Sequence, residues 1–246
     1  MDDTLFDHTR TARAAIGSVR RKLPSLHGYS LDELSIAYAE ILEATHPDVL
    51  RGRWSHVEAR AVRWRRLIRR FGGRPTPAAV EEIAELYRRV YLARQRPVPG
   101  APELVRWLHR RMAVGIVTNN TVAEQERKLR FLGLGRVVDA LVVSERVGAE
   151  KPDPRIFRAA LRELSVGAEE AVMVGDSWRF DVEGARAAGI RAVWFNRFRR
   201  PAPAGPPAEE IRSLRPADRI GRRLNAFGRR GPDSARIISR PPMHSR

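Results

Sequence analysis

The sequence has no cysteine, few lysines and no long apolar run, and each absence narrows the class of protein. Without Cys, disulfide bonds and cysteine-ligated metal sites are excluded. No apolar stretch approaches the roughly 18 residues of a membrane-spanning helix. Met1 is followed by Asp2 and Asp3, whose charge is opposite to that of a secretory leader. We therefore expect a soluble, cytoplasmic protein without a membrane partner.

The basic residues are almost all arginines, since Lys22, Lys128 and Lys151 are the only lysines among 46 Lys and Arg. The formal net charge of +17 would by itself suggest a nucleic-acid-binding protein. However, residues 197–246 hold 13 Arg against four acidic residues, so much of the excess lies near the C-terminal end. Net charge describes how a protein associates and not how it folds. We attribute the Arg bias to codon usage and do not expect nucleic acid as the partner.

Residues 11–95 carry helical signals. Ser30 and Glu33 in SLDE form a capping box, in which each side chain satisfies a free amide of the first turn. Thr76 and Pro77 begin a later helix as N-cap and first helical residue. Apolar residues recur at helical spacing after both starts. We expect a small helical bundle over 11–95.

The pattern changes after Arg96, where helices alternate with short apolar runs. The runs, in chain order, are MAVGIVTNN, DALVVS, AVMVGD and RAVWFN. This alternation predicts a parallel sheet with crossover helices, and ligands of such sheets bind at the carboxyl ends of the strands. The expected fold class is therefore α/β, a Rossmann-like parallel-sheet core with an inserted α-helical part.

The C-terminal residues show little apolar periodicity. Residues 200–210 are rich in Pro and Ala and are typical of a loop, and EIRSL from Glu210 is a candidate edge strand. Farther on, the chain is rich in Arg, Gly and Pro. We expect residues 216–246 to form a basic, disordered tail.

Polar residues at three strand ends suit phosphate chemistry. Thr118 and Asn119 offer a hydroxyl, an amide and helix N-terminal amides to a tetrahedral anion, although the same pair is also ordinary helix capping. Lys151 is a compact ammonium in a chain that otherwise uses Arg, with a solvated loop lysine as the alternative. Asp176 and Asp181 place two carboxylates at one strand end, which suits a hard divalent cation such as Mg²⁺. Asp181 would also serve as a helix N-cap.

In these motifs the chain resembles the haloacid dehalogenase superfamily of phosphohydrolases over about residues 1–215. Thr118 matches the family's second motif, Lys151 the third, and Gly175-Asp176 with Asp181 the fourth, in the family's order. The helical insert resembles the family's C1-type cap.

The resemblance implies a domain organisation. It divides the chain into an α/β core, a helical cap and the basic tail: residues 1–10 and 96–215, residues 11–95, and residues 216–246.

The family's first motif ends an apolar strand with Asp-x-Asp-x-Thr, whose first Asp is the nucleophile. Here Met1 falls on the first x, Asp2 on the second Asp and Thr4 on the Thr, so the nucleophile would lie directly before Met1. That strand is central in the family's sheet, and each buried backbone group left unpaired costs roughly 1–3 kcal/mol. A chain that starts at Met1 is therefore expected to fold poorly. We prefer a true start about ten residues, one strand length, upstream; the alternative is a fragment or an inactive pseudoenzyme that binds a phosphorylated ligand or partner.

For the complete protein, the resemblance implies Mg²⁺-dependent hydrolysis of a small phosphorylated metabolite through an aspartyl-phosphate. Asp2 would be the general acid and base, with its backbone carbonyl on Mg²⁺. Asp176 and Asp181 would complete the metal site, with orientation of Lys151 as the alternative role of Asp181. Three side chains would hold the phosphoryl oxygens: Thr118, Asn119 and Lys151. A phosphate mutase, the physiological substrate and the oligomeric state stay open.

Overall fold

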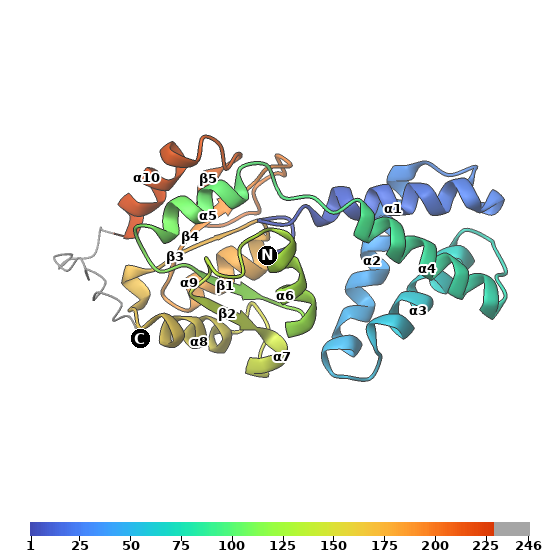
Figure 1. The fold of residues 1–246 in the computed structure, drawn as a ribbon, viewed down its shortest axis with the longest axis horizontal. Coiled ribbons are helices and arrows are strands. Elements are labelled where there is room, and N and C mark those ends of the chain that lie inside the picture. Colours follow the sequence, from blue (N-terminus) through green and yellow to red (C-terminus); the bar gives the residue numbers. More distant parts are fainter. Residues whose placement is uncertain (229–246) are drawn as a thin grey trace, which may run out of the picture.

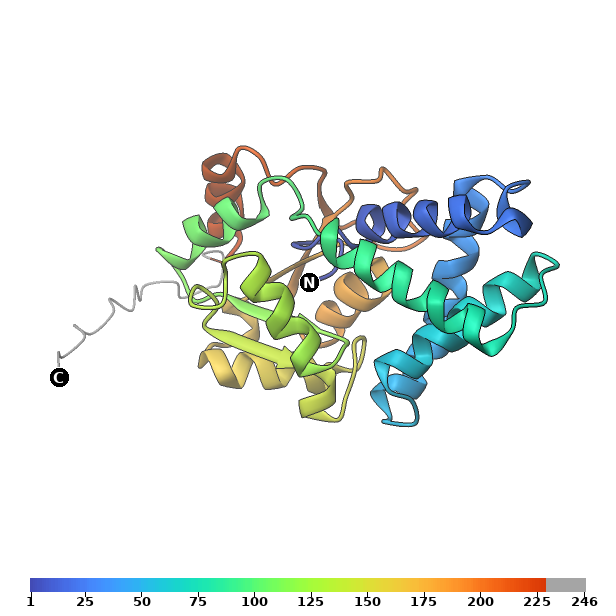
Figure 2. The same cartoon turned by 45° about the vertical axis from the view of Figure 1, so that its right-hand side comes forward.

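A computed structural model describes residues 1–228, which form two neighbouring parts (Figure 1). One part is helical and consists of α1 (His8–Lys22), η1 (Pro24–Leu26), α2 (Leu31–Leu50), α3 (His56–Arg70) and α4 (Pro77–Ala93). α1 packs on α4 and α2 packs on α3, as both views show (Figures 1 and 2). The chain enters this part before α1 and leaves it after α4. Within residues 1–228, no helix is long and apolar enough to cross a bilayer.

The helical part begins its helices where the sequence predicts. The Ser30 hydroxyl accepts from the Glu33 amide at 3.1 Å, and the Glu33 carboxylate accepts from the Ser30 amide at 2.8 Å. The capping box is therefore confirmed. Thr76 caps α4 with Pro77 in its first turn, also as predicted. Tyr38, Trp64 and Tyr87 then pack their rings together, with centroids 5.1–5.4 Å apart, and bury the centre of the helical part.

The second part alternates strands and helices. Its strands are β1 (Gly115–Thr118), β2 (Ala140–Val143), β3 (Val172–Gly175), β4 (Arg191–Phe195) and β5 (Glu209–Ile211). Its helices are α5 (Ala101–His109), α6 (Val122–Phe131), α7 (Ser144–Val147), α8 (Pro154–Leu164), η2 (Ala168–Glu170), the π-helical turn η3 (Trp178–Glu183), α9 (Gly184–Ala187) and α10 (Ala217–Gly228). All strand pairs are parallel, so the predicted α/β class is confirmed and the carboxyl ends share one edge.

The strands form two sheets where the sequence predicts one. β1 pairs with β2, with Thr118 opposite Val143, and β3 pairs with β4, which pairs with β5. In Figure 1 the strand labels run β5, β4, β3, β1, β2 from top to bottom. Met1 and Phe6 are buried in a core cluster that includes Ile116 of β1 and Val193 of β4, so side-chain packing connects the two sheets. The first residues contribute only isolated bridges, Asp2 with Phe6 and Phe6 with Pro97.

The prediction of a disordered tail from residue 216 is wrong for residues 217–228. These residues form α10, which packs on α5, with Leu224 buried. Gly221 lies so close to the Trp107 ring that a Cβ there would overlap with it. The helix packs through a few small and apolar residues, which also include Ala217 and Ile220, and this signal does not stand out from the Arg-rich surroundings. The rest of the predicted tail, residues 229–246, lies outside the described residues.

Candidate active site

The loop after β1 is tied to the loop that carries Lys151. Thr118 is the buried last residue of β1. The Asn119 side chain donates to the Lys151 carbonyl at 2.9 Å and accepts from the Lys151 amide at 2.7 Å. Asn119 therefore fixes the Lys151 backbone, a role that the sequence did not predict.

Lys151 and Asp181 form a buried ion pair. The Lys151 Nζ donates to the Asp181 Oδ1 at 2.6 Å, and both side chains are less than a tenth exposed. The Asp181 Oδ2 accepts from the Ser177 amide at 3.0 Å. Burial alone would raise the pKa of Asp181, but the Lys151 ammonium and these hydrogen bonds outweigh it and hold the pKa below its ordinary value. The carboxylate fits against the strand end because Gly175 has no Cβ, which would overlap with it.

Asp176 follows β3 and is held differently from Asp181. Its Oδ1 accepts from the Thr4 hydroxyl at 2.9 Å, and no Lys or Arg within residues 1–228 forms an ion pair with it. Burial, followed by the negative charges of Asp181 and Asp3, raises the pKa of Asp176 to about 6. A carboxylate that is buried beside other carboxylates without a basic partner is the group that a divalent cation would stabilise.

Asp2 is paired with Lys128, which the sequence analysis did not assign to the site. The Lys128 Nζ donates to both Asp2 oxygens at 2.6 and 2.7 Å, and its side chain is 3% exposed. Burial alone would raise the pKa of Asp2, but Lys128 holds it far below its ordinary value. The scarcity of lysine that singled out Lys151 applies equally to Lys128, so the signal was present in the sequence.

The predicted metal set is only partly assembled. Among residues 1–228, no three Asp, Glu or His side chains form a metal-binding cluster. Asp2 faces Lys128 and Asp181 faces Lys151, so lysines already neutralise two of the three predicted carboxylates. The Lys128 pair involves the Asp2 side chain and not the backbone carbonyl predicted to face Mg²⁺, so the predicted metal roles of Asp2, Asp176 and Asp181 stay predictions. Asp176 fits a cation, and the geometry of Asp181 agrees with the alternative of orienting Lys151.

The predicted residues nevertheless surround one point. The buried nitrogen of Met1 interacts electrostatically with Lys151, Asp181, Asp2 and Asp176. The same neighbourhood connects to Thr118 through its chain neighbour Asn119. Hydrogen bonds therefore connect the first residues of the chain to the end of β3, and connect the loops after β1 and β3 to Lys151.

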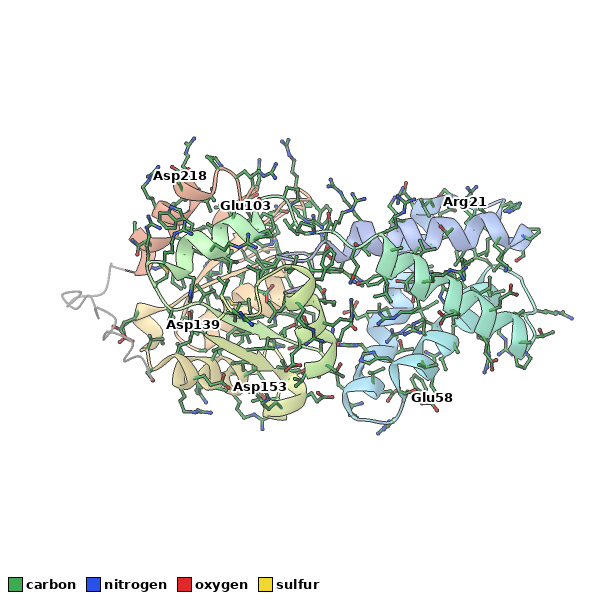
Figure 3. The ribbon with its side chains drawn as sticks, in the orientation of Figure 1. Arg21, Glu58, Glu103, Asp139, Asp153 and Asp218 are labelled. Carbon is green, nitrogen blue, oxygen red and sulfur yellow. The ribbon has the colours of Figure 1, made fainter. Side chains whose placement is uncertain are left out.

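Arg197 connects the segment before α1 to the loop after β4. Its Nη2 donates to Asp3 at 2.7 Å and to Asp7 at 2.6 Å, with the Arg197 side chain 8% exposed. Asp7 also caps α1 through the Arg10 amide. Arg197 thus fixes one of the two connections between the parts. These buried pairs contrast with the charged residues labelled in Figure 3, such as Asp153 and Asp218, which lie on the outside.

Two histidines of the helical part contact the loop after β1. The His46 Nε2 of α2 lies 3.3 Å from the Asn119 carbonyl, and the His56 Nε2 of α3 lies 2.9 Å from the Thr121 hydroxyl. The helical part therefore contacts the loop that directly follows Thr118.

Comparison with known proteins identifies relatives of this chain. A family model described as haloacid dehalogenase-like hydrolase matches residues 1–189. The chain is 32% identical over 222 residues to the ribulose-1,5-bisphosphate 5-phosphatase of Halopiger xanaduensis. The aligned region covers 89% of this chain and 87% of that enzyme. It is 31% identical to the glyceraldehyde 3-phosphate phosphatase of Pyrococcus abyssi, over 79% of this chain and 78% of that one. It is 39% identical to the phosphoserine phosphatase of Thermus thermophilus, over 62% of this chain and 61% of that enzyme.

Solved structures share the fold. The HAD-hydrolase YfnB from Bacillus subtilis superposes with a TM-score of 0.69 at 24% identity, over 92% of this chain and 96% of that one. The HAD phosphatase from Thermococcus onnurineus gives a TM-score of 0.54 at 28% identity, over 89% and 94%. These findings confirm the fold class and the resemblance predicted from the strand-end motifs. The chain belongs to the haloacid dehalogenase-like hydrolase family.

Proposed function

We propose that this protein is a Mg²⁺-dependent phosphohydrolase that cleaves a small phosphate monoester through an aspartyl-phosphate. One observation carries the proposal: the buried Lys151–Asp181 pair lies against the end of β3, directly before Asp176, and Asn119 ties Lys151 to the loop that follows Thr118. Relatives named as phosphatases of ribulose-1,5-bisphosphate, glyceraldehyde 3-phosphate and phosphoserine support the reaction class.

The phosphoryl group binds at the ends of β1 and β3. The Lys151 ammonium offers a point charge, and Thr118 offers a hydroxyl at the end of β1, shortly before α6. Asp181 orients the Lys151 side chain, and Asn119 fixes its backbone. Groups that are already in place stabilise the charge of the transition state without reorganising, which is usually the largest catalytic contribution.

Asp176 is the side chain best suited to hold Mg²⁺, together with the backbone carbonyl of Asp2. When bound, Mg²⁺ supplies positive charge that polarises the phosphoryl oxygens. Thr4 holds the other side of Asp176 through its hydroxyl and so fixes the carboxylate. The helical part, residues 11–95, serves as a cap whose histidines approach the loop that carries Thr118.

The nucleophile in this mechanism is an aspartate joined to the Met1 nitrogen. Its carboxylate attacks phosphorus, the P–O bond to the leaving group breaks, and protonated Asp2 gives its proton to the leaving oxygen. Asp2 then takes a proton from water, whose oxygen attacks phosphorus, releases phosphate and regenerates the aspartate. Lys128 keeps Asp2 ionised, which suits the second step. The first step therefore requires that substrate binding weakens the Asp2–Lys128 pair.

A matched pair of extended chains tests the nucleophile. One carries an apolar strand ending in Asp directly before Met1, and the other carries the same strand ending in Asn. With Mg²⁺ and p-nitrophenyl phosphate, the Asp chain is expected to turn over, and the Asn chain and the chain starting at Met1 are not. Equal turnover by all three chains would contradict the assignment. Binding without turnover in all three would favour an inactive ligand-binding protein, and transfer of the phosphoryl group to a second sugar would favour a mutase.

The metal role is tested by Asp176→Asn in the active extended chain. We expect turnover to fall at least about 100-fold, with partial recovery at high Mg²⁺ concentration, because a ligand is weakened. Asp218→Asn is the matched control, since Asp218 pairs with Arg222 on the exposed face of α10. Unchanged Mg²⁺ dependence in Asp176→Asn would refute the role of Asp176.

A further inference from the structure

One face of α3 carries a row of basic residues that begins at the active-site loop. His56, Arg60 and Arg63 are spaced by four and three residues, so they share one face of the helix. His56, at the start of α3, contacts the Thr121 hydroxyl beyond β1. The row therefore leads from the phosphate-binding end of the sheet into the helical part.

Arg63 is a buried guanidinium without an acidic partner. It is 8% exposed, and its Nε donates to the Thr45 hydroxyl at 2.8 Å. Its Nη2 is buried and has no hydrogen-bond partner, and within residues 1–228 no carboxylate forms an ion pair with it. Tyr38 hydrogen-bonds to the Arg63 guanidinium, and Tyr87 interacts with it electrostatically. Burying an unpaired charge is unfavourable unless something else offsets it.

Other basic side chains lie near Arg63. Burial lowers the pKa of His46 and of His56, and Arg63 lowers both further. Burial and Arg88 lower the pKa of Arg60 in the same way.

Two acidic groups of this neighbourhood already have basic partners. Glu124 bonds Arg127 at 2.6 Å and lies 3.9 Å from Arg88, and Asp2 is held by Lys128. Glu85 is exposed on the surface of α4. The positive charge around Arg63 therefore exceeds the negative charge.

We propose that Arg63 binds a second anionic group of the substrate, a carboxylate or a second phosphate, while the scissile phosphate lies at Lys151. This inference rests on the proposed function and narrows its substrate class to phosphate monoesters that carry another anion. The guanidinium is suited to the task because its Nη2 has no partner and can donate to an oxygen of a carboxylate or phosphate. His46 connects the two ends of such a ligand, since it contacts Asn119 and interacts electrostatically with both Arg63 and Asp2.

Binding to the chain as given, with Mg²⁺ present, tests the inference without requiring turnover. The first ligand pair is 3-phosphoglycerate and glycerol 3-phosphate, which differ by a carboxylate in place of a hydroxymethyl group. The second pair is 1,3-propanediol bisphosphate and its monophosphate. In one pair, titration calorimetry is expected to show at least about tenfold tighter binding of the member that carries the second anionic group, because of one charge-assisted contact. The pair that shows the preference identifies carboxylate or phosphate as the second group.

Variants of Arg63 separate binding from packing. Arg63→Gln is expected to remove the preference, and Arg63→Lys to keep part of it because the charge remains without the forked donors. Arg65→Gln, on the exposed face of α3, is the matched control and should keep the full preference. Circular dichroism checks folding, and if Arg63→Gln does not fold, the wild-type ligand pairs and Arg63→Lys decide.

Two results would overturn the inference. If the wild type binds both members of each ligand pair equally, Arg63 is only a packing residue. If folded Arg63→Gln keeps the preference, another residue binds the second anionic group. If glycerol 3-phosphate still binds in either case, the proposed function stands. If no phosphate ester binds, both proposals fail.

Discussion

In the part built around the sheets, the two buried lysines each have a carboxylate: Lys128 holds Asp2 and Lys151 holds Asp181. In the helical part, the buried Arg63 has a threonine hydroxyl and tyrosines beside it but no acid among the described residues. The sheet part therefore balances its buried basic side chains internally, whereas the helical part leaves one unbalanced.

This difference separates two uses of a buried charge. A paired lysine is oriented before the substrate arrives, which suits a group that stabilises a transition state. An unpaired arginine has donors left for a ligand, which suits a group that selects a substrate. Changes in the two parts should accordingly have different consequences, in catalysis on one side and in binding or stability on the other.

The largest expected effect is on catalysis in the sheet part. Lys151→Met in the active extended chain should lower kcat by about 100- to 1000-fold, because a placed charge on the phosphoryl oxygens is lost. Lys22→Met is the control, since Lys22 pairs with Glu82 on the surface of the helical part. Steady-state hydrolysis of p-nitrophenyl phosphate measures both. A similar kcat in the two variants would remove Lys151 from the mechanism.

The packing of α10 on the sheet part should produce the next effect. Gly221→Ala should lower the free energy of unfolding by about 1–3 kcal/mol, because the new Cβ overlaps with the Trp107 ring. Gly28→Ala is the matched control, since a Cβ there meets nothing within 4 Å. Urea unfolding followed by circular dichroism compares the two. A stabilised Gly221→Ala would mean that α10 does not pack as described.

The connection between the two parts should show a pH-dependent effect. Burial alone would raise the pKa of Asp7. The hydrogen bond and the charge of Arg197 outweigh burial, so the pKa lies below its ordinary value of 3.8. Asp7 therefore takes up its proton more readily in the unfolded chain than in the folded one. The stabilisation of the folded state by ionised Asp7 is complete above pH 3.8 and is lost as the pH falls through the folded pKa. Asp7→Asn should cost about 1–3 kcal/mol at pH 7.

Urea unfolding at pH 7 and at pH 3 measures this difference between wild type and Asp7→Asn. The difference should shrink at the lower pH, where wild-type Asp7 begins to take up its proton. A difference that is the same at both values would show that the Asp7–Arg197 pair contributes nothing through its charge.

The smallest expected effect lies in the helical part alone. Ser30→Ala removes the capping hydroxyl of α2 and should lower stability by about 1 kcal/mol. Phosphate-ester binding should not change, because Ser30 is exposed and lies at the far end of α2 from His46. Thermal unfolding and calorimetry on one preparation test both statements. A loss of ligand affinity without loss of stability would contradict the separation between the parts.

The features that the sequence predicts well are local. The capping box at Ser30, the N-cap at Thr76 and the strand that ends at Gly175 each depend on residues a few positions apart. The fold class followed from the alternation of these elements, and the candidate residues Lys151 and Asp176 followed from their places at strand ends.

The features that the sequence did not reveal connect distant positions. Lys128 and Asp2 are 126 residues apart, and Arg197 and Asp7 are 190 apart. No local pattern records which lysine will neutralise which carboxylate. Two of the three residues predicted for the metal site, Asp2 and Asp181, have lysine partners that the sequence did not reveal, and their place in the metal site stays a prediction.

The most direct test is a crystal structure of the chain soaked with Mn²⁺ and tungstate, located by their anomalous scattering. We predict Mn²⁺ on the Asp176 carboxylate and tungstate against Thr118 and the Lys151 ammonium, close to each other. Mn²⁺ and tungstate bound in separate places, with Asp176 and Lys151 contacting neither, would contradict it.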